Sequence, residues 1–313
     1  MIAFINHSFF TLEFLLQLVT NGLANGAIYA AMALTVVIIY KTTGHLNFAQ
    51  GELATFAAFV VYVITVEQHI SIWIAIPVVV VASMAAGGLV ERFLVRPVES
   101  RSGLAVVIVT LGLFLLLNAL TAVIWGTQPK AALTPFPGGI DDQFTVLKGP
   151  PQFSIGYDSI GTWIVLAIVV VAVSLLMSKT KLGLGYRAVA SNRESAVLVG
   201  IPVSRMLMLG WALSTGIGAL AGVLVSQSSG ILDFNLMGSV LIYGFAAAAL
   251  GGFDSITGAV VGGLIVGLAE ALLPNMFTFI GSELSLAMAL VIILAVLLAR
   301  PQGLFGSRRV LRV

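Results

Sequence analysis

A short segment between two apolar stretches carries residues whose spacing suits hydrogen bonding at a helix end. Residues 190–202 read ASNRESAVLVGIP, in which Ser191 and Glu194 form an S-x-x-E pattern. In such a capping box the serine side chain accepts from the glutamate N–H, and the glutamate side chain reaches back to the serine N–H. Gly200 suits the left-handed position after a helix, and Pro202 prevents continuation. The pattern predicts a helix of about two turns over 192–199, a short rigid element suited to contact.

A helix this short is not stable alone in water, so it must dock on something. Val197, Leu198 and Ile201 give it an apolar side. Two interpretations stay open. The helix packs on its own chain as an amphipathic loop helix, or part of its surface is offered to a partner protein.

The remaining residues offer little for catalysis. Cysteine is absent, which excludes disulfides and thiol chemistry, and the three histidines (His7, His45, His69) are too widely separated to favour a metal site. No G-x-x-x-x-G-K-[ST] loop for nucleotide phosphates occurs. The sequence also shows no pairing of a nucleophile with a general base, which argues against an enzyme. Four acidic residues near membrane depth must each face protein or a water-filled path: Glu52, Asp233, Asp254 and Glu270.

The elements that must position these residues are apolar helices. Of the 313 residues 59% are hydrophobic and 9% are charged, and the mean hydropathy is +1.09; a soluble domain has about 25% charged residues. Because apolar runs of about 18 residues or more can cross a bilayer, we predict a single all-α polytopic membrane domain over 1–313 with about eight to ten transmembrane helices. The predicted spans are 11–39, 46–66, 70–90, 104–126, 162–178, 206–226, 236–252, 257–273 and 284–299.

The distribution of Lys and Arg predicts the orientation. With the N-terminus outside and the C-terminus in the cytoplasm, 13 of the 15 Lys and Arg residues fall in inner segments, and only Lys130 and Lys148 lie outside. This agrees with the positive-inside rule. It places the Pro- and Gly-rich loop 127–161 outside and the basic segment 179–205 in the cytoplasm. The pI near 9.0 therefore records orientation and does not indicate nucleic-acid binding.

Two segments far apart in the sequence resemble each other. TTGHLNFAQG at 42–51 aligns with SSGILDFNLMG at 228–238, with the later glycine one residue out of step. In the predicted topology the two copies approach the membrane from opposite sides, which is typical of an inverted repeat with broken helices beside a transport pathway. The alternative is chance recurrence of Gly-polar-aromatic clusters between spans.

A family resemblance covers the chain from about Asn21 to Gly306. ESAVLVG, from Glu194 to Gly200, resembles the EAA-x-x-x-G signature of ABC-importer permeases, with Ser195 in place of the first alanine. Further stretches are similar to branched-chain amino acid permeases: TKLGLGYRAVASNRESAVLVGIPVSRM, YKTTGHLNFAQGE, ALAGVL, LGGFDSITGAVVGGLIVGLAEALL and RPQGLFG. LNFAQGE and the short length resemble the H-type subunit rather than the longer M-type. The family usually has His at the position of Gln50.

The resemblance implies a permease subunit of an ATP-driven importer in the bacterial inner membrane, forming the path for branched-chain or related amino acids or amides. The chain itself would be no enzyme and hold no cofactor, with ATP and Mg²⁺ bound by two cytoplasmic ATPase subunits. A second, M-type-like permease subunit and a periplasmic or extracellular solute-binding protein are the other implied partners, beside the lipid bilayer.

The resemblance also assigns roles to residues. Those implied to couple to the ATPase, through the short coupling helix, are Arg187, Ser191, Arg193, Glu194, Ser195, Ala196 and Gly200. The residues predicted to line the translocation path come instead from the two similar segments and their flank: Asn47, Phe48, Gln50, Glu52, Asp233 and Phe234. The alternative is a stand-alone secondary transporter or channel for a small polar or aliphatic solute, which would need no docking helix.

Overall fold

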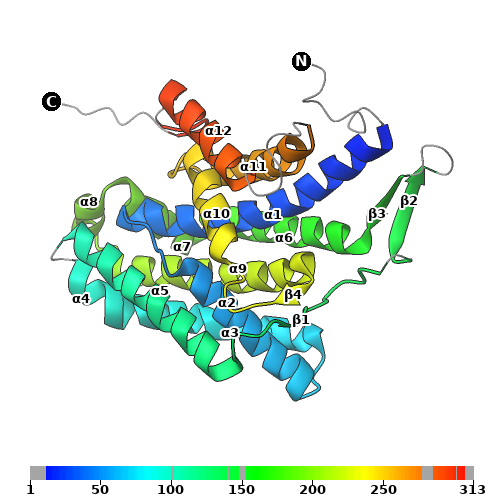
Figure 1. Cartoon of the computed structure of the whole chain (residues 1–313). Helices are drawn as coiled ribbons and strands as arrows, with labels where there is room; N and C mark the ends of the chain where they lie inside the picture. The colour runs from blue at the N-terminus through cyan, green and yellow to red at the C-terminus, as the bar shows by residue number, and fades with distance from the viewer. Residues whose placement is uncertain are drawn as a thin grey trace. The chain divides into compact units, whose positions relative to one another are not determined.

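Helices dominate the computed structural model (Figure 1). It describes residues 12–99, 102–139, 141–147, 153–276, 285–300 and 302–306. Seven helical segments of this part are long and apolar enough to cross a membrane: α1 (Leu12–Thr43), α2 with η3 (Gln50–Tyr62, Val63–Glu67), α3 with η4 and α4 (Ile72–Val90, Glu91–Val95, Arg96–Glu99), α5 (Gly103–Trp125), α6 (Tyr157–Lys179), α9 (Val203–Ser229) and α11 (Ile256–Met276). The shorter helices are α7 (Lys181–Ser191), α8 (Arg193–Leu198), α10 (Gly238–Gly251) and α12 (Ser285–Ala299).

The predicted all-α polytopic fold is confirmed, and every predicted span falls on a helix. The observed helices differ from the predicted spans in length. The first helix continues to Thr43, beyond the last apolar residue, and stops only where Gly44 takes a φ of +74°. The span predicted over 236–252 is the 14-residue helix α10, which rises about 21 Å and is shorter than the bilayer core of about 30 Å.

The segment predicted as an external loop also contains strands, which the sequence analysis did not predict. β2 (Gln143–Leu147) and β3 (Phe153–Gly156) form an antiparallel hairpin with Phe144 opposite Ile155. β1 (Lys130–Ala131) pairs with β4 (Ile231–Leu232). The hairpin strands are rich in aromatic and β-branched residues, which favour extended backbone. The external location itself stays a prediction.

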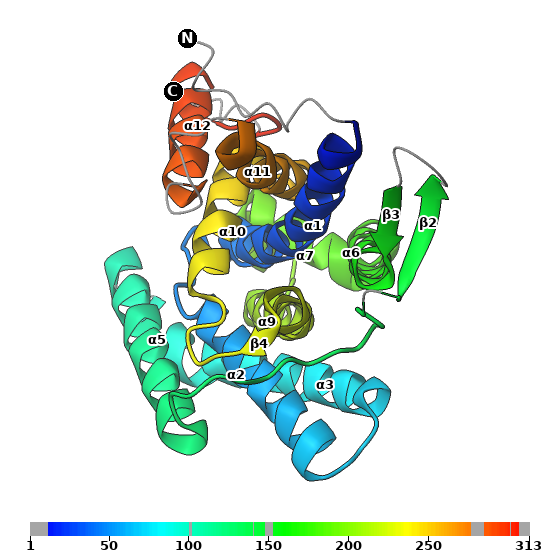
Figure 2. The same ribbon diagram turned by 45° about the vertical axis from the view of Figure 1, so that its right-hand side comes forward.

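The chain divides into two compact units. The first comprises residues 1–33, 134–166 and 242–313, and the second comprises 34–133 and 167–241. In the first unit α11 lies beside α1 (Figures 1 and 2). A Cβ atom on Gly263 would lie 2.3 Å from Ala30 Cα, and one on Gly267 would lie 2.3 Å from Gly26 Cα. Only glycine permits so close an approach of two helix backbones.

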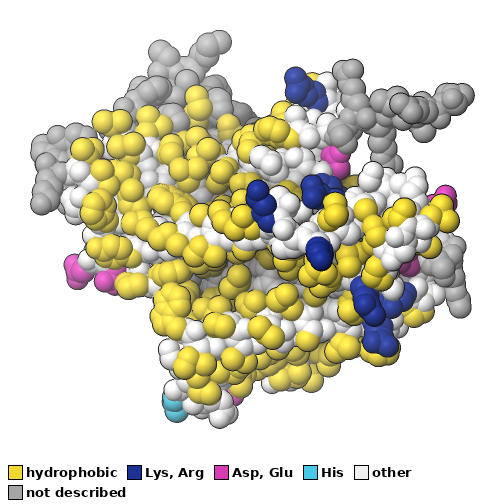
Figure 3. All heavy atoms as spheres, turned by 180° about the vertical axis from the view of Figure 1, so that it is seen from behind, with side chains coloured by type: hydrophobic (Ala, Val, Ile, Leu, Met, Phe, Trp, Pro, Cys, Tyr) yellow, Lys and Arg dark blue, Asp and Glu magenta, His cyan; other side chains and the backbone are white. Residues whose placement is uncertain are grey.

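In the second unit α9 packs against α2 and α3, and α2 also contacts α5. Trp211 on α9 is 1% exposed and forms a core cluster with Ile39, Val95 and Val106. Outward-facing positions are also apolar: Val123 on α5 is 82% exposed. Hydrophobic side chains cover most of the face seen in Figure 3, as expected of a surface in contact with lipid rather than water.

Candidate functional site

The segment 179–205 folds into two consecutive short helices. α7 begins after Thr180, whose side chain accepts a hydrogen bond from Gly183 N at 3.0 Å. It ends at Ser191, and Asn192 alone separates it from α8. The Asn192 side chain accepts from Ser195 N at 2.8 Å and so caps the first turn of α8.

The predicted capping box was therefore wrong by one residue. Ser191 is the last residue of α7, and its backbone is already helical, so it cannot serve as the cap of the next helix. Asn192 takes the extended conformation that an N-cap requires, with φ −154° and ψ 111°. Glu194 still lies in the first turn of α8, where a negative charge is favourable.

The C-terminal end of α8 matches the prediction. Gly200 has a φ of +78°, its N–H donates to Val197 O, and the N–H of Ile201 donates to Ala196 O. These two bonds form a Schellman motif, in which a left-handed residue closes the helix and satisfies its last carbonyl groups. The two caps hold a helix of only six residues in one conformation.

The two helices differ in how they meet the rest of the second unit. Gly183, Tyr186 and Val189 of α7 are buried, and the Tyr186 hydroxyl donates to Ile38 O of α1. Burial raises the pKa of Tyr186 well above its usual value. In α8 only Ala196 is buried, whereas Val197, Leu198 and Val199 are 59%, 86% and 74% exposed. So α7 docks on its own chain, and α8 presents an apolar tip (Val197–Val199) outward.

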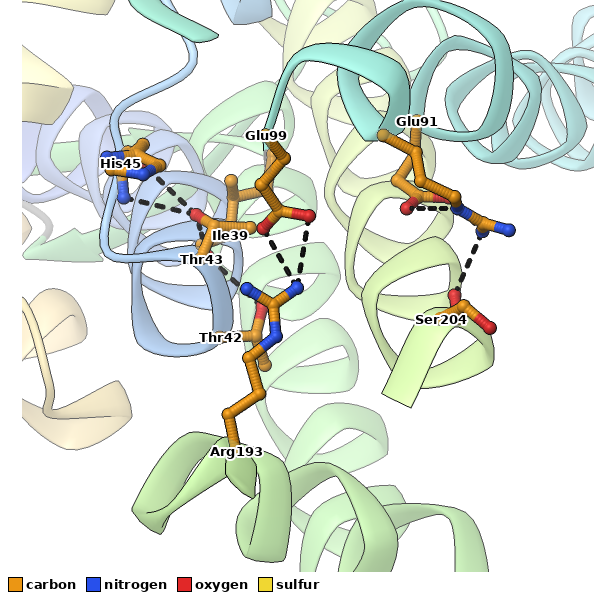
Figure 4. Close-up of polar contacts among 9 residues, drawn as sticks. Ile39, Thr42, Thr43, His45, Glu91, Glu99, Arg193 and Ser204 are labelled. Atoms are coloured by element: carbon orange, nitrogen blue, oxygen red, sulfur yellow. Dashed lines mark hydrogen bonds and ion pairs between the residues drawn. The ribbon is translucent and has the colours of Figure 1, made fainter. Parts of the chain in front are cut away.

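An ion pair fixes α8 to another part of the chain. Arg193 Nη2 lies 3.0 Å from both carboxylate oxygens of Glu99, at the end of α4 (Figure 4). A second pair, also drawn there, joins Arg96 to Glu91, and Arg96 Nη2 donates to Ser204 O at 3.1 Å near the start of α9. Glu99 is 94 residues from Arg193, and no sequence pattern indicated this contact.

The other residues predicted for coupling lie at the surface of the same segment. Glu194 and Ser195 are exposed on α8. Arg187 is exposed on α7, and its Nε donates to Gly183 O at 3.4 Å. Their predicted role in coupling is a proposal taken up below.

The two similar segments have matching local structures. Gly44 and Gly230 follow α1 and α9 with φ values of +74° and +73°. Three residues later, Asn47 Oδ1 accepts from Ala49 N at 3.1 Å, and Asp233 Oδ1 accepts from Asn235 N at 2.8 Å. A new helix then begins, at residue 50 in one copy and 238 in the other. A left-handed glycine followed by a side-chain-bonded turn breaks the helix in both copies.

The first copy is tied into the core by a buried amide. Gln50 is fully buried; its Nε2 donates to Ser214 O at 3.0 Å, and its Oε1 accepts from Asn47 Nδ2 at 3.1 Å. Ser214 Oγ lies 3.0 Å from Gln50 Oε1 and 3.1 Å from Thr35 O. Gln50 thus connects the start of α2 with α9, and through Ser214 with α1. Ser214 was missed because 164 residues separate it from Gln50.

A polar bridge joins the two copies. Glu52 is 2% exposed and accepts from Asn118 Nδ2 of α5 at 3.3 Å, and the same amide nitrogen donates to Asn235 Oδ1 at 3.1 Å. Asp233 and Phe234 are partly buried in the second copy, as is Phe48 in the first. Asn118 therefore bonds Glu52, a predicted path residue directly after the first copy, and Asn235 of the second copy, which was not among the predicted residues.

Comparison with known proteins places the chain in a family. Residues 18–299 match the family model described as the permease component of the branched-chain amino acid transport system. The chain belongs to this family. It is therefore a transporter subunit and a multi-pass protein of the plasma membrane.

Curated relatives extend over nearly the whole chain. The high-affinity branched-chain amino acid transport system permease protein BraD of Pseudomonas aeruginosa is 28% identical over 306 residues, covering 95% of this chain and 98% of BraD. LivH of Escherichia coli is 28% identical over 312 residues, covering 96% and 98%. The probable LivH of Methanocaldococcus jannaschii is 29% identical over 299 residues, covering 88% and 87%.

Proposed function

We propose that this chain is a permease subunit of an ATP-binding-cassette importer and forms part of the path for branched-chain or related amino acids. Membership of the permease family and the names of its relatives support the transported class. We further propose four partner classes: a second permease subunit, two cytoplasmic ATPase subunits that bind ATP and Mg²⁺, and an external solute-binding protein. ATP hydrolysis then takes place outside this chain.

The observation that carries the coupling proposal is the exposed apolar tip of α8. Leu198 is 86% exposed at the end of a helix that is capped at both ends. An apolar tip on a rigid element is suited to a cleft in another protein, because burial of each large side chain contributes about 1.5–3 kcal/mol. Arg187, Glu194 and Ser195 are also exposed on α7 and α8 and would complete the contact.

The proposed coupling follows from the connections of α8. When ATP closes the two ATPase subunits, the clefts that hold the coupling helices move. Arg193 links α8 to Glu99, just before α5, and Tyr186 links α7 to the last part of α1. Motion at α8 then reaches two membrane helices, α5 through the ion pair and α1 through the tyrosine hydrogen bond. The ion pair is the more exposed of these two contacts.

The proposed path runs along the two helix breaks. Asn47, Phe48 and Gln50 lie in the first copy, Glu52 follows it directly, and Asp233 and Phe234 lie in the second copy. Asn47, Gln50 and Glu52 are buried in the conformation described. The proposal requires that they become accessible when the importer opens, with the two phenylalanines acting as gates.

Reconstitution tests the transport class. Proteoliposomes that contain this chain, the second permease, the ATPases and the binding protein should take up leucine only when ATP is present. Robust uptake by this chain alone, driven by an ion gradient without any ATPase, would instead identify a stand-alone secondary transporter and overturn the proposal.

Gly200 tests the coupling role. Its φ of +78° suits glycine, and a Cβ there would meet no atom within 4 Å, so a substitution acts through the backbone alone. Gly200→Val should strain the end of α8 by about 1–2 kcal/mol and lower the solute taken up per ATP hydrolysed. Gly200→Asn is the matched control, because asparagine tolerates this conformation. Equal coupling in both variants and the wild type would contradict the role of α8.

A further inference from the structure

A second acidic site lies in the first unit, on a helix to which the path proposal assigns nothing. Glu270 of α11 accepts two hydrogen bonds from α1, from the Tyr29 hydroxyl at 3.0 Å and from Asn25 Nδ2 at 3.2 Å. Both bonds go to Oε2. The other oxygen, Oε1, has no hydrogen-bond partner among the residues that the structure describes. The carboxylate is therefore held in place with one oxygen still available to a donor.

The location makes an unneutralised carboxylate costly. Tyr29 lies near the middle of the 32-residue helix α1, and Glu270 lies within the 21-residue helix α11. Both helices are long and apolar enough to cross a membrane, so both residues belong to membrane-spanning segments. Glu270 is nevertheless partly exposed. Since a carboxylate is expensive to place against lipid, its exposed part must face a water-filled path or another protein.

The surroundings of Glu270 favour a cation. In the described part of the chain Glu270 has no Lys or Arg partner, and its two donors are neutral groups that orient the carboxylate without neutralising it. The Tyr29 ring stacks on Tyr243 of α10 with centroids 4.7 Å apart, and both tyrosines are buried, so the stack fixes the Tyr29 hydroxyl against Oε2. A carboxylate without a charged partner forms a strong, charge-assisted hydrogen bond with an ammonium group.

We propose that Glu270 binds the α-ammonium group of the transported amino acid through Oε1. Tyr29 and Asn25 act as positioning residues that hold Oε2. This inference rests on the proposed function and adds a solute contact in the first unit. A fixed cation from the second permease subunit would satisfy the same oxygen, and a proton would do so as well. The experiment below separates these occupants.

The test compares two substitutions in the complete importer reconstituted with its binding protein. Glu270→Gln keeps the size and an acceptor for Tyr29 and Asn25 but removes the charge. Glu270→Asp keeps the charge but shortens the side chain. If the carboxylate binds ammonium, Glu270→Gln should lower ATP-driven leucine uptake by roughly tenfold or more, with unchanged yield of the complex and unchanged ATPase activity without solute. Glu270→Asp should retain several-fold more uptake than Glu270→Gln.

The opposite order would overturn the inference. A packing role, or a carboxyl group that works protonated, predicts that Glu270→Gln transports as well as wild type and better than Glu270→Asp. Loss of the second permease subunit from purified Glu270→Gln complexes would identify the occupant as that subunit's cation. Absence of ATP-driven uptake in the wild-type complex would instead refute the proposed function.

If the Glu270 variants do not assemble, two further variants test whether Glu270 binds the ammonium group. Tyr29→Phe keeps the charge and the ring stack but removes one hydrogen bond to Oε2, and Asn25→Ala removes the other. Each should weaken uptake at low leucine concentration by roughly two- to tenfold, since one hydrogen bond to a charged group is lost. Unchanged leucine dependence in both variants would overturn the inference.

Discussion

Reversing the ion pair between α8 and α4 should release α8 from α4. Arg193 Nη2 lies 3.0 Å from both oxygens of Glu99, whose side chain is 10% exposed against 41% for Arg193. A fully exposed pair contributes about 0.2–1 kcal/mol. Glu99 is largely buried, and Arg193→Glu places a second negative charge beside it. We expect α8 docking to lose about 1–2 kcal/mol, a shift of about five- to thirtyfold toward the undocked helix.

Docking and coupling are measured separately. The sequence contains no cysteine, so spin labels on cysteines introduced at Val98 and Ser195 report the distance between α4 and α8. Arg193→Glu and Glu99→Arg should each broaden and lengthen this distance, and each should lower the solute taken up per ATP hydrolysed. The double reversal should recover most of both, because it rebuilds the pair with its charges exchanged.

Lys181→Glu provides the control. Lys181 is exposed on α7 and, within the described ranges, makes no hydrogen bond or ion pair. This variant makes the same change in charge but should leave the label distance as in wild type. Single reversals that keep the wild-type distance, or a double reversal no better than the singles, would refute the view that this pair holds α8.

Three further predictions follow from the packing. Gly263→Leu should prevent α11 from approaching α1 and abolish recovery of folded protein in size-exclusion chromatography, whereas Gly112→Leu should be tolerated, because a Cβ at Gly112 meets nothing within 4 Å. Gln50→Ala should lower the thermal unfolding temperature in detergent, with a loss of about 2–4 kcal/mol, because it leaves the buried groups that bond Gln50 without partners; an unchanged unfolding temperature would contradict the network. Tyr186→Phe should cost about 1 kcal/mol at any pH between 6 and 9. The raised pKa of Tyr186 in the folded state keeps its hydroxyl protonated. The contribution of this hydroxyl to stability is therefore lost only as pH rises above the unfolded-state pKa of about 10. A difference in stability from wild type that changes with pH between 6 and 9 would contradict this prediction.

The membrane helices could be predicted because a bilayer imposes a simple requirement on the sequence. Long apolar runs placed each of the nine predicted spans on a helix, although α10 is shorter than the bilayer core. The two helix breaks were found from similarity alone, because a left-handed glycine and a short polar side chain three residues later leave a recognisable pattern.

Other features depend on contacts that sequence order does not reveal. Ser191 and Asn192 are both good N-cap residues, and only the end of α7 decides between them. The partners of Gln50 and Arg193 lie far along the chain. The β2–β3 hairpin was missed because its short strands lie among Pro and Gly residues that suggest only a loop.

The outward tip of α8 also bears on how the subunit is produced in the cell. Three consecutive large apolar side chains, Val197 to Val199, are more than half exposed. Adjacent exposed apolar side chains of this kind favour association with other proteins and aggregation, and chaperones and proteases act on such surfaces. Under the proposed function an ATPase subunit covers this tip, and a copy made in excess of that ATPase exposes it. Balanced synthesis of the two subunits then limits the amount of exposed apolar surface.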